Sequence, residues 1–345
     1  MAIAQEPATL TQATLLQPSQ TRTAEGHERR VGVEIELSGI TYAELLGIMT
    51  TFFNAPALEQ ARYEHLISTG LGDFVVELDS APVKKLDLRH SDLPEPLAAL
   101  SNMTGDLIDS AAERIVPLEV ISPPMPLSQL DQIERLCIRL REAGALGSRH
   151  AIWYAFGLQL NPELPALDAA TILNYLRAFS GLYEWLKARR QLDISRKFTT
   201  YIDPYPTAYV ELLMNPNYAP GLEQLIEDYI DHNPTRNRAM DLMPLFAHLE
   251  PDLIRERIGD PRIKSRPTLH VRLPDCDIDN PDWHFADVWN DWVQVDDLAN
   301  DPDRLAAMCK TYRDRHCFRL ENLLSDWEEE SQQFLPHGEA VADVH

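Results

Sequence analysis

Two carboxylates stand two residues apart in a short apolar segment, Gly32-Val33-Glu34-Ile35-Glu36-Leu37. On a β-strand, side chains two residues apart point to the same face, so Glu34 and Glu36 project together while their apolar neighbours face the core. Adjacent carboxylates repel one another unless a cation or arginines lie between them, and Mg²⁺ prefers oxygen ligands of this kind. The pattern indicates a cation site, and the alternative is an ordinary amphipathic strand whose polar face meets water.

The same acidic alternation recurs in two later segments. Glu77 and Asp79 share a face in residues 74–79, and Glu119 is the single carboxylate in the apolar run 116–121. A lone carboxylate in an apolar strand has to be paired, protonated or bound to a metal. Each could form a salt bridge at the rim of a sheet, but three acidic strands together favour one shared acidic site.

Basic residues gather in one quarter of the chain. Of the 31 Lys+Arg, 13 fall within residues 187–272 beside 12 Asp+Glu, so this stretch carries 13 − 12 = +1 while the rest carries −24. Within it, Asn233-Pro234 forms a turn before Arg236 and Arg238, whose planar donor forks suit phosphate or carboxylate. The alternative is that these two arginines pair with Asp228, Asp231 or Asp241.

A second basic run, residues 266–275, brings a histidine close to an arginine. If this run is a strand, His270 and Arg272 share one face, and Pro274 ends the ladder beyond them. The alternative is a histidine packed in the core. The functional interpretation requires that this face looks toward Glu34 and Glu36.

The elements that position these residues follow from periodicity and from capping signals. We expect strands at residues 31–37, 73–78, 116–121, 153–160 and 268–273. We expect helices at residues 42–53, 96–114, 127–143, 168–187, 221–229 and 288–298, with Asp168 as an N-cap and Gly144 just past a C-terminus. No Gly-rich phosphate loop follows a strand, which excludes a Rossmann fingerprint and a P-loop. The pattern favours an α+β domain on a mainly antiparallel sheet with flanking helices.

Composition and charge limit the classes of protein to which this chain can belong. The 345 residues are 44% hydrophobic and 25% charged, as in a folded protein, and we expect a flexible leader at 1–26, one catalytic domain at 27–327 and an acidic to polar tail at 328–345. A net charge of −23 argues against nucleic-acid and anionic-membrane partners. The sequence has no secretion-like start, no 18-residue apolar run and no C-x-x-C pair. We therefore expect a cytoplasmic protein with unpaired thiols.

Six runs in their order strongly resemble the amidoligase family. They are residues 32–37, 74–79, 117–124, 155–163, 233–246 and 266–275, and the resemblance extends from about Arg29 to Ala299. That family is grouped with glutamine synthetase and glutamate–cysteine ligase as ATP-dependent carboxylate–amine ligases. The resemblance implies a glutamine synthetase/glutamate–cysteine ligase-like catalytic domain.

The resemblance also implies roles for single residues. Glu34 and Glu36 match the metal-binding Glu-x-Glu strand of glutamine synthetase, and residues 270–275 look like its late Glu-Val-Arg-Phe-Pro-Asp strand. The implied metal ligands are therefore Glu34, Glu36, Glu77, Glu119 and His270. The implied phosphate-binding residues are Arg236, Arg238 and Arg272, while Asn161 and Arg196 are implied to hold the substrate carboxylate or amine.

One position departs from the family pattern. Relatives usually carry a histidine where this chain has Gln159, and the comparable strand of glutamine synthetase supplies a metal-binding histidine. Glutamine can offer a carbonyl oxygen to Mg²⁺, but as a weaker and neutral ligand. Altered metal affinity, a changed substrate and lost activity are all open interpretations.

The activity implied is ligation through an acyl phosphate. ATP and Mg²⁺ (or Mn²⁺) are the expected cofactors, small-molecule or peptide carboxylates and amines are the expected substrates, and a partner enzyme from a shared pathway is possible. Two rival hypotheses are a non-catalytic scaffold that uses Trp283, Trp289 and Trp292 as a partner surface, and an ATP phosphotransferase of the guanidino-kinase type.

Overall fold

The computed structural model describes residues 14–78, 117–147, 157–189, 203–273, 275–317 and 324–338. Asp79, Arg196, Pro274, the predicted helix at 96–114 and the first part of the predicted strand at 153–160 lie outside these ranges. The elements described below position most of the candidate site residues.

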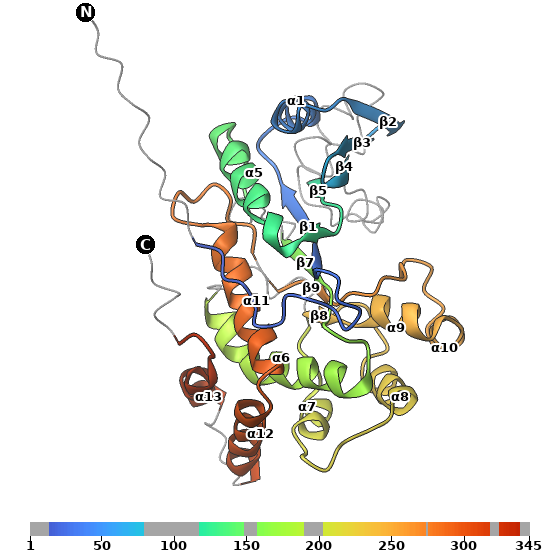
Figure 1. Ribbon diagram of the computed structural model, residues 1–345, viewed down its shortest axis with the longest axis vertical. Coiled ribbons are helices and arrows are strands. Elements are labelled where there is room, and N and C mark those ends of the chain that lie inside the picture. The colour runs from blue at the N-terminus through green and yellow to red at the C-terminus, as the bar shows by residue number, and fades with distance from the viewer. Residues whose placement is uncertain are drawn as a thin grey trace, which may run out of the picture.

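A single antiparallel sheet organises the described residues (Figure 1). Its strands follow the order β2-β3-β4-β5-β1-β7-β9-β8, and β6 also pairs with β1. The strands are β1 Arg30–Leu37, β2 Ala57–Ala61, β3 Glu64–Thr69, β4 Gly72–Leu78, β5 Leu118–Ile121, β6 Met125–Pro126, β7 Leu158–Pro162, β8 Met240–Asp241 and β9 His270–Val271. The predicted α+β class with a mainly antiparallel sheet is confirmed.

Strand β1 shows why the sheet has two different faces. Its alternating residues Val31, Val33, Ile35 and Leu37 are at most 1% exposed, whereas Glu34 and Glu36 between them are partly exposed. β-branched side chains favour the extended backbone, and alternation places them all on the buried face. The polar face of β1 therefore stays available for chemistry.

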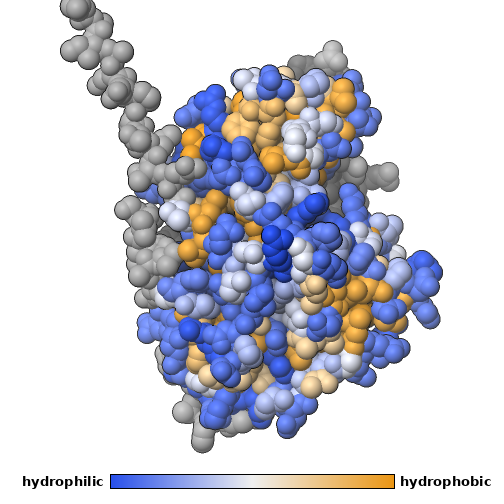
Figure 2. Space-filling model, in the orientation of Figure 1, coloured by the Kyte–Doolittle hydropathy of each residue, from blue (hydrophilic) through white to orange (hydrophobic). Residues whose placement is uncertain are grey.

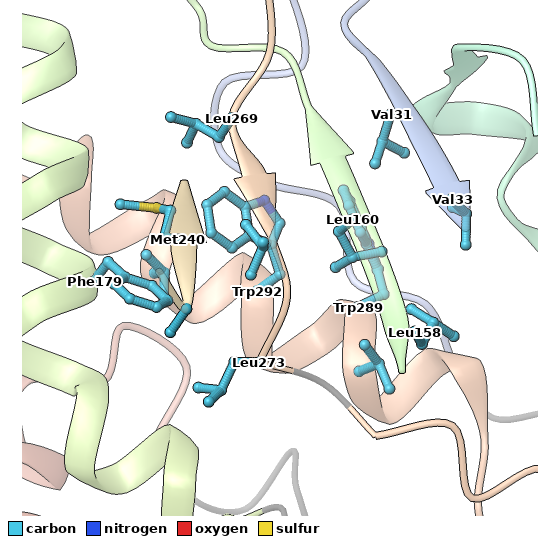
Figure 3. Close-up of a cluster of buried hydrophobic side chains, with 14 of the residues drawn as sticks. Val31, Val33, Leu158, Leu160, Phe179, Met240, Leu269, Leu273, Trp289 and Trp292 are labelled. Atoms are coloured by element: carbon cyan, nitrogen blue, oxygen red, sulfur yellow. The ribbon is translucent and has the colours of Figure 1, made fainter. Parts of the chain in front are cut away.

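Helices complete the described fold. They are α1 Tyr42–Phe53, α5 Asp131–Glu142, α6 Ala169–Arg189, α7 Thr207–Leu213, α8 Leu222–His232, α9 Met243–Leu249, α10 Pro251–Arg257, α11 Phe285–Ala299, α12 Pro302–Cys317 and α13 Leu324–Ser331, with 3-10 turns η1 Leu127–Gln129 and η4 Gln332–Phe334. Helices α6 and α11 contact one another and enclose Leu160, Val271 and Leu273 (Figures 1 and 3). Helix α1 lies over the other end of the sheet, where Phe53 packs on Phe74 with ring centroids 4.4 Å apart.

The three tryptophans considered as a partner surface are buried instead. Trp283, Trp289 and Trp292 are 7%, 2% and 3% exposed, and Trp289 and Trp292 pack against the sheet (Figure 3). The large apolar area of a tryptophan stabilises a core when it is removed from water. These side chains therefore belong to the core and do not form the partner surface that the scaffold hypothesis expected.

Both predicted capping signals are confirmed. Asp168 precedes α6, and its Oδ1 accepts a hydrogen bond from the backbone N–H of Thr171 at 2.9 Å. Gly144 follows α5 with a φ of 92°, a backbone conformation that side-chain-bearing residues rarely adopt.

The two ends of the described chain are packed against the fold. Residues within 14–26 contact α11, where Trp289 donates to the carbonyl of Leu16 and Asn290 donates to that of Thr14. From the other end, His337 Nε2 lies 2.6 Å from Asp297 Oδ2. Both end segments of the described chain are therefore fixed to α11 by hydrogen bonds.

Cys137, Cys276 and Cys309 are buried free thiols, as expected. The visible surface is mainly hydrophilic with scattered hydrophobic patches (Figure 2). Within the described ranges, no helix has the length and apolarity needed to cross a bilayer.

Candidate active site

Acidic side chains form a row across four adjacent strands. Cross-strand pairing joins Glu64 to Glu77, Glu77 to Glu119, and Glu119 to Glu36. Residues directly opposite in antiparallel strands share a face, so the row lies on the polar face of the sheet. The structure thus places Glu36, Glu77 and Glu119 opposite one another on neighbouring strands.

The polar face continues from β1 across β7 to the basic strands. Glu34 is opposite Gln159, and Gly32 is opposite Asn161. Leu160 pairs with Val271 on the buried face, which places Gln159, Asn161, His270 and Arg272 together on the polar side. The predicted requirement that His270 and Arg272 share a face with the Glu34–Glu36 pair is met.

Hydrogen-bond donors surround the two β1 carboxylates. Glu36 accepts from the backbone N–H of Gly157 and from Gln159 Nε2, both at 2.8 Å. Glu34 Oε1 accepts from Asn161 Nδ2 at 2.9 Å and from Arg266 Nη1 at 3.3 Å. Charge-assisted bonds of this kind compensate the mutual repulsion of the two carboxylates.

Gln159 does not present its carbonyl oxygen to these carboxylates or to a cation between them. Its NH₂ group donates to Glu36, and its Oε1 instead accepts from Arg272 Nη1 at 3.3 Å. A carboxylate can only accept, so the amide has to turn its nitrogen toward Glu36. In this arrangement Gln159 connects the acidic part of the face to Arg272.

The carboxylate oxygens of Glu34, Glu36 and Glu119 suit a hard divalent cation. Among the described residues, however, no group of three His, Cys, Asp or Glu side chains is gathered closely enough to hold a metal ion. The donor chemistry fits Mg²⁺, while the carboxylates of Glu34 and Glu36 are held by hydrogen bonds to neighbouring donors.

A basic group occupies the β8–β9 end of the face. Arg272 Nη2 lies 3.8 Å from Oδ2 of the fully buried Asp241, and that oxygen accepts no hydrogen bond from the described residues. Burial raises the pKa of Asp241 to about 6, against the opposing influence of Arg272, Arg236 and Arg266. Burial and the neighbouring Arg272 lower the pKa of Arg236. Three guanidinium groups therefore surround one buried carboxyl.

His270 lies opposite Asp241 and is only 3% exposed. Its Nδ1 lies 2.6 Å from Asn161 Oδ1, and its Nε2 is buried without a hydrogen-bond partner. Burial, followed by the charges of Arg272, Arg266 and Arg236, holds the pKa of His270 well below its usual value. Three nearby positive charges also oppose a cation at this histidine.

Comparison with known protein families shows to which family the chain belongs. A family model described as "putative amidoligase enzyme" matches residues 27–294, well over half of the chain. The chain belongs to the amidoligase family. No curated protein and no solved structure matches it.

In this amidoligase, the two predicted phosphate-binding arginines of residues 233–238 have different surroundings. Arg236 lies near Arg272 and Asp241, whereas Arg238 Nη1 donates to the carbonyl of Pro204 at 2.7 Å. Two of the predicted alternative partners are engaged elsewhere, because Asp228 accepts from Tyr218 and Asp231 pairs with Arg257. The third, Asp241, lies near Arg236. Arg196 lies outside the described residues.

Three residues of this polar face were not predicted as site residues. Arg266 precedes His270 by four positions, so its even spacing along an extended run already favoured the same face. Asp241 was considered only as a partner for Arg236 or Arg238, whereas the structure pairs it with Arg272. Glu64 was also missed, because the β2–β3 hairpin was not predicted.

Proposed function

We propose that this amidoligase is an ATP-dependent carboxylate–amine ligase that works through an acyl phosphate, on a glutamine synthetase-like catalytic fold. One observation carries the proposal: a single sheet face bears the carboxylates Glu34 and Glu36 beside the arginines Arg266 and Arg272. A magnesium triphosphate carries both signs of charge and therefore requires both kinds of partner.

The acidic part is proposed to bind the cation. Glu34, Glu36 and Glu119 are the main ligands, and Glu77 extends the row. Mg²⁺ or Mn²⁺, when bound, neutralises phosphate charge and orients the phosphate oxygens. The arrangement supports neither Gln159 nor His270 as a ligand, because Gln159 turns its NH₂ group to Glu36 and His270 lies near three arginines.

The basic part is proposed to bind phosphate. Arg272, Arg236 and Arg266 provide the guanidinium donors, and Arg238 supports the turn that presents Arg236 by bonding to the carbonyl of Pro204. Arg196 is proposed to hold the substrate carboxylate. Planar forks suit the paired oxygens of phosphate and carboxylate groups.

The reaction proceeds in two substitutions. A substrate carboxylate oxygen attacks the γ-phosphorus of ATP, the bond to the bridging oxygen breaks, and ADP leaves with that electron pair. The amine nitrogen then attacks the acyl carbon, the acyl C–O bond breaks, phosphate leaves with its electron pair and the nitrogen loses a proton. The protein contributes positioning and charge neutralisation rather than a covalent intermediate.

The proposal is tested by product analysis with a panel of amino-acid and peptide carboxylates, each with and without added amines. Release of ADP and phosphate that requires both substrates, with ¹⁸O moving from a labelled carboxylate into phosphate, is the expected result. ADP with a phosphorylated product and no free phosphate would identify the phosphotransferase, and no ATP turnover with any pair would favour the scaffold.

A matched pair of variants assigns the turnover to this face. Glu36→Gln should abolish turnover, because it removes one of the two β1 carboxylates. Glu59→Gln, an exposed position on β2 of the same sheet, should leave it unchanged. Equal turnover in both variants would place the reaction elsewhere.

A further inference from the structure

Two side-chain amides on β7 connect the acidic part of the polar face to the basic part. Gln159 donates from Nε2 to Glu36 at 2.8 Å and accepts at Oε1 from Arg272 at 3.3 Å. Asn161 donates from Nδ2 to Glu34 at 2.9 Å, and its Oδ1 lies 2.6 Å from His270 Nδ1. Being two residues apart on one strand, the amides form parallel links from β1 to the β9 segment.

The direction of each link is determined by chemistry. A carboxylate only accepts hydrogen bonds and a guanidinium only donates them, so a group between Glu36 and Arg272 has to donate on one side and accept on the other. The primary amide of Gln159 meets that requirement while it remains uncharged. On the same logic, Asn161 turns its oxygen to His270, which places the imidazole proton on Nδ1 and leaves the lone pair on Nε2.

We propose that Gln159 and Asn161 are positioning residues. Both amides orient the β1 carboxylates relative to the β9 segment, and Gln159 also stands between Glu36 and Arg272 in place of a direct ion pair. The roles of the two charged parts rest on the function proposed above. A direct Glu36–Arg272 pair would neutralise the carboxylate needed for the cation and the guanidinium needed for phosphate. The intervening amide holds both side chains without pairing one charge directly with the other.

This arrangement links the two parts energetically. A hydrogen-bonded chain polarises each of its members, so a change at Glu36 is felt at Arg272 through Gln159. Removing the amide should therefore weaken cation binding and anion binding together. Removing a residue that only ligates the cation would instead weaken cation binding and leave anion binding unchanged.

The test compares Gln159→Met with Gln224→Met. Methionine keeps the length of glutamine and removes both hydrogen bonds, and Gln224 is a matched control because its Nε2 donates to Asp228 Oδ1 at 2.8 Å on the exposed side of α8. Titrations use Mn²⁺ without nucleotide and, separately, ATP in excess EDTA. Gln159→Met should weaken both by about tenfold, a loss typical of hydrogen bonds to charged groups, while Gln224→Met should change neither.

Two outcomes of these titrations would overturn the proposal. Loss of Mn²⁺ affinity with unchanged ATP affinity would make Gln159 a metal ligand. A lower melting temperature with both affinities unchanged would make it a merely structural residue.

A ligand-free readout separates failure of this proposal from failure of the proposed function. In Gln159→Met, but not in Gln224→Met, the Nε–H group of Arg272 should become more mobile in ¹⁵N relaxation, because Gln159 no longer holds the guanidinium. An equally rigid Arg272 would overturn the role of Gln159 whether or not ATP binds. A wild-type protein that binds no ATP while Arg272 loosens as expected would refute the ligase and support the positioning role.

The role of Asn161 has its own measurement. Imidazole ¹⁵N shifts should place the His270 proton on Nδ1 in the wild type, and Asn161→Leu should abolish that preference. An unchanged tautomer in Asn161→Leu would overturn the role of Asn161.

Discussion

At the scale of single residues, burial shifts the pKa values of both members of the cross-strand pair Asp241 and His270. Burial raises the pKa of Asp241 to about 6 and lowers the pKa of His270 well below 6.5, so both shifts are toward the neutral form, although Asp241 is still mainly ionised at pH 7. The neighbouring arginines favour the neutral form of His270 and oppose the neutral form of Asp241. A ligand with negative charge is the natural complement of such a surplus of guanidinium groups.

The pH dependence of His270 follows from the sign of its shift. Its pKa is lower in the folded protein than in the unfolded chain, so its contribution to stability is complete above the unfolded value of 6.5 and is lost as pH falls through the folded value. We predict that the His270 imidazole is still neutral at pH 6 in metal-free protein, as measured by its ¹⁵N shifts. A protonated ring at pH 6 would contradict the burial and the arginine surroundings.

At the scale of elements, strands and helices with a strong local sequence pattern could be predicted. Short strands that form only through pairing with distant parts of the chain could not. Strand β1 and helix α1 follow from alternation and from periodicity, and the observed helix α1, Tyr42–Phe53, has the predicted bounds. The β2–β3 hairpin has mostly exposed side chains and little alternation, so it gave no signal. Strands β8 and β9 are two residues long and are determined by pairing with each other and with β7.

The same distinction applies to the site. Glu34 and Glu36 share one face of their strand, and so do His270 and Arg272, because each pair is spaced two residues apart. The direction of the Gln159 amide could not be predicted, because it depends on Glu36 and Arg272, each more than 100 residues away along the chain.

The cap of α6 gives a prediction at this scale. Asp168→Ala should lower the free energy of unfolding by about 1 kcal/mol, because the N–H of Thr171 loses its acceptor. The same N–H lowers the pKa of Asp168, so the stabilisation is present above the unfolded value of 3.8 and is lost as pH falls through the folded value. Urea unfolding at pH 7 checks the loss, and an unchanged midpoint would show that the cap adds nothing.

At the scale of the whole molecule, both ends of the described chain meet on α11, behind the sheet. Arg29, at the start of the fold, forms a buried ion pair with Asp296 of α11, with exposed side-chain fractions of 2% and 1%. Tyr175 of α6 donates to the same carboxylate at 2.8 Å. The network joins β1, α6 and α11, and so supports the strand that carries Glu34 and Glu36.

Arg29→Met should be strongly destabilising. It leaves Asp296 buried without its counter-ion, and breaking a buried pair in this way costs about 3–5 kcal/mol. Arg29→Met combined with Asp296→Leu should recover much of that loss, because no uncompensated charge remains. Denaturant unfolding of the two variants checks this, and a double variant as unstable as the single one would show that packing, not charge, decides the effect.

Calorimetric titration of ATP, with Mg²⁺ and without it, tests most directly that one sheet face binds a magnesium nucleotide. The account predicts that the wild type binds MgATP, that Glu36→Gln and Arg272→Met each weaken binding by at least about tenfold through loss of a charged partner, and that Glu59→Gln has no effect. No binding by folded wild-type protein, or equal affinity in all three variants, would contradict the account.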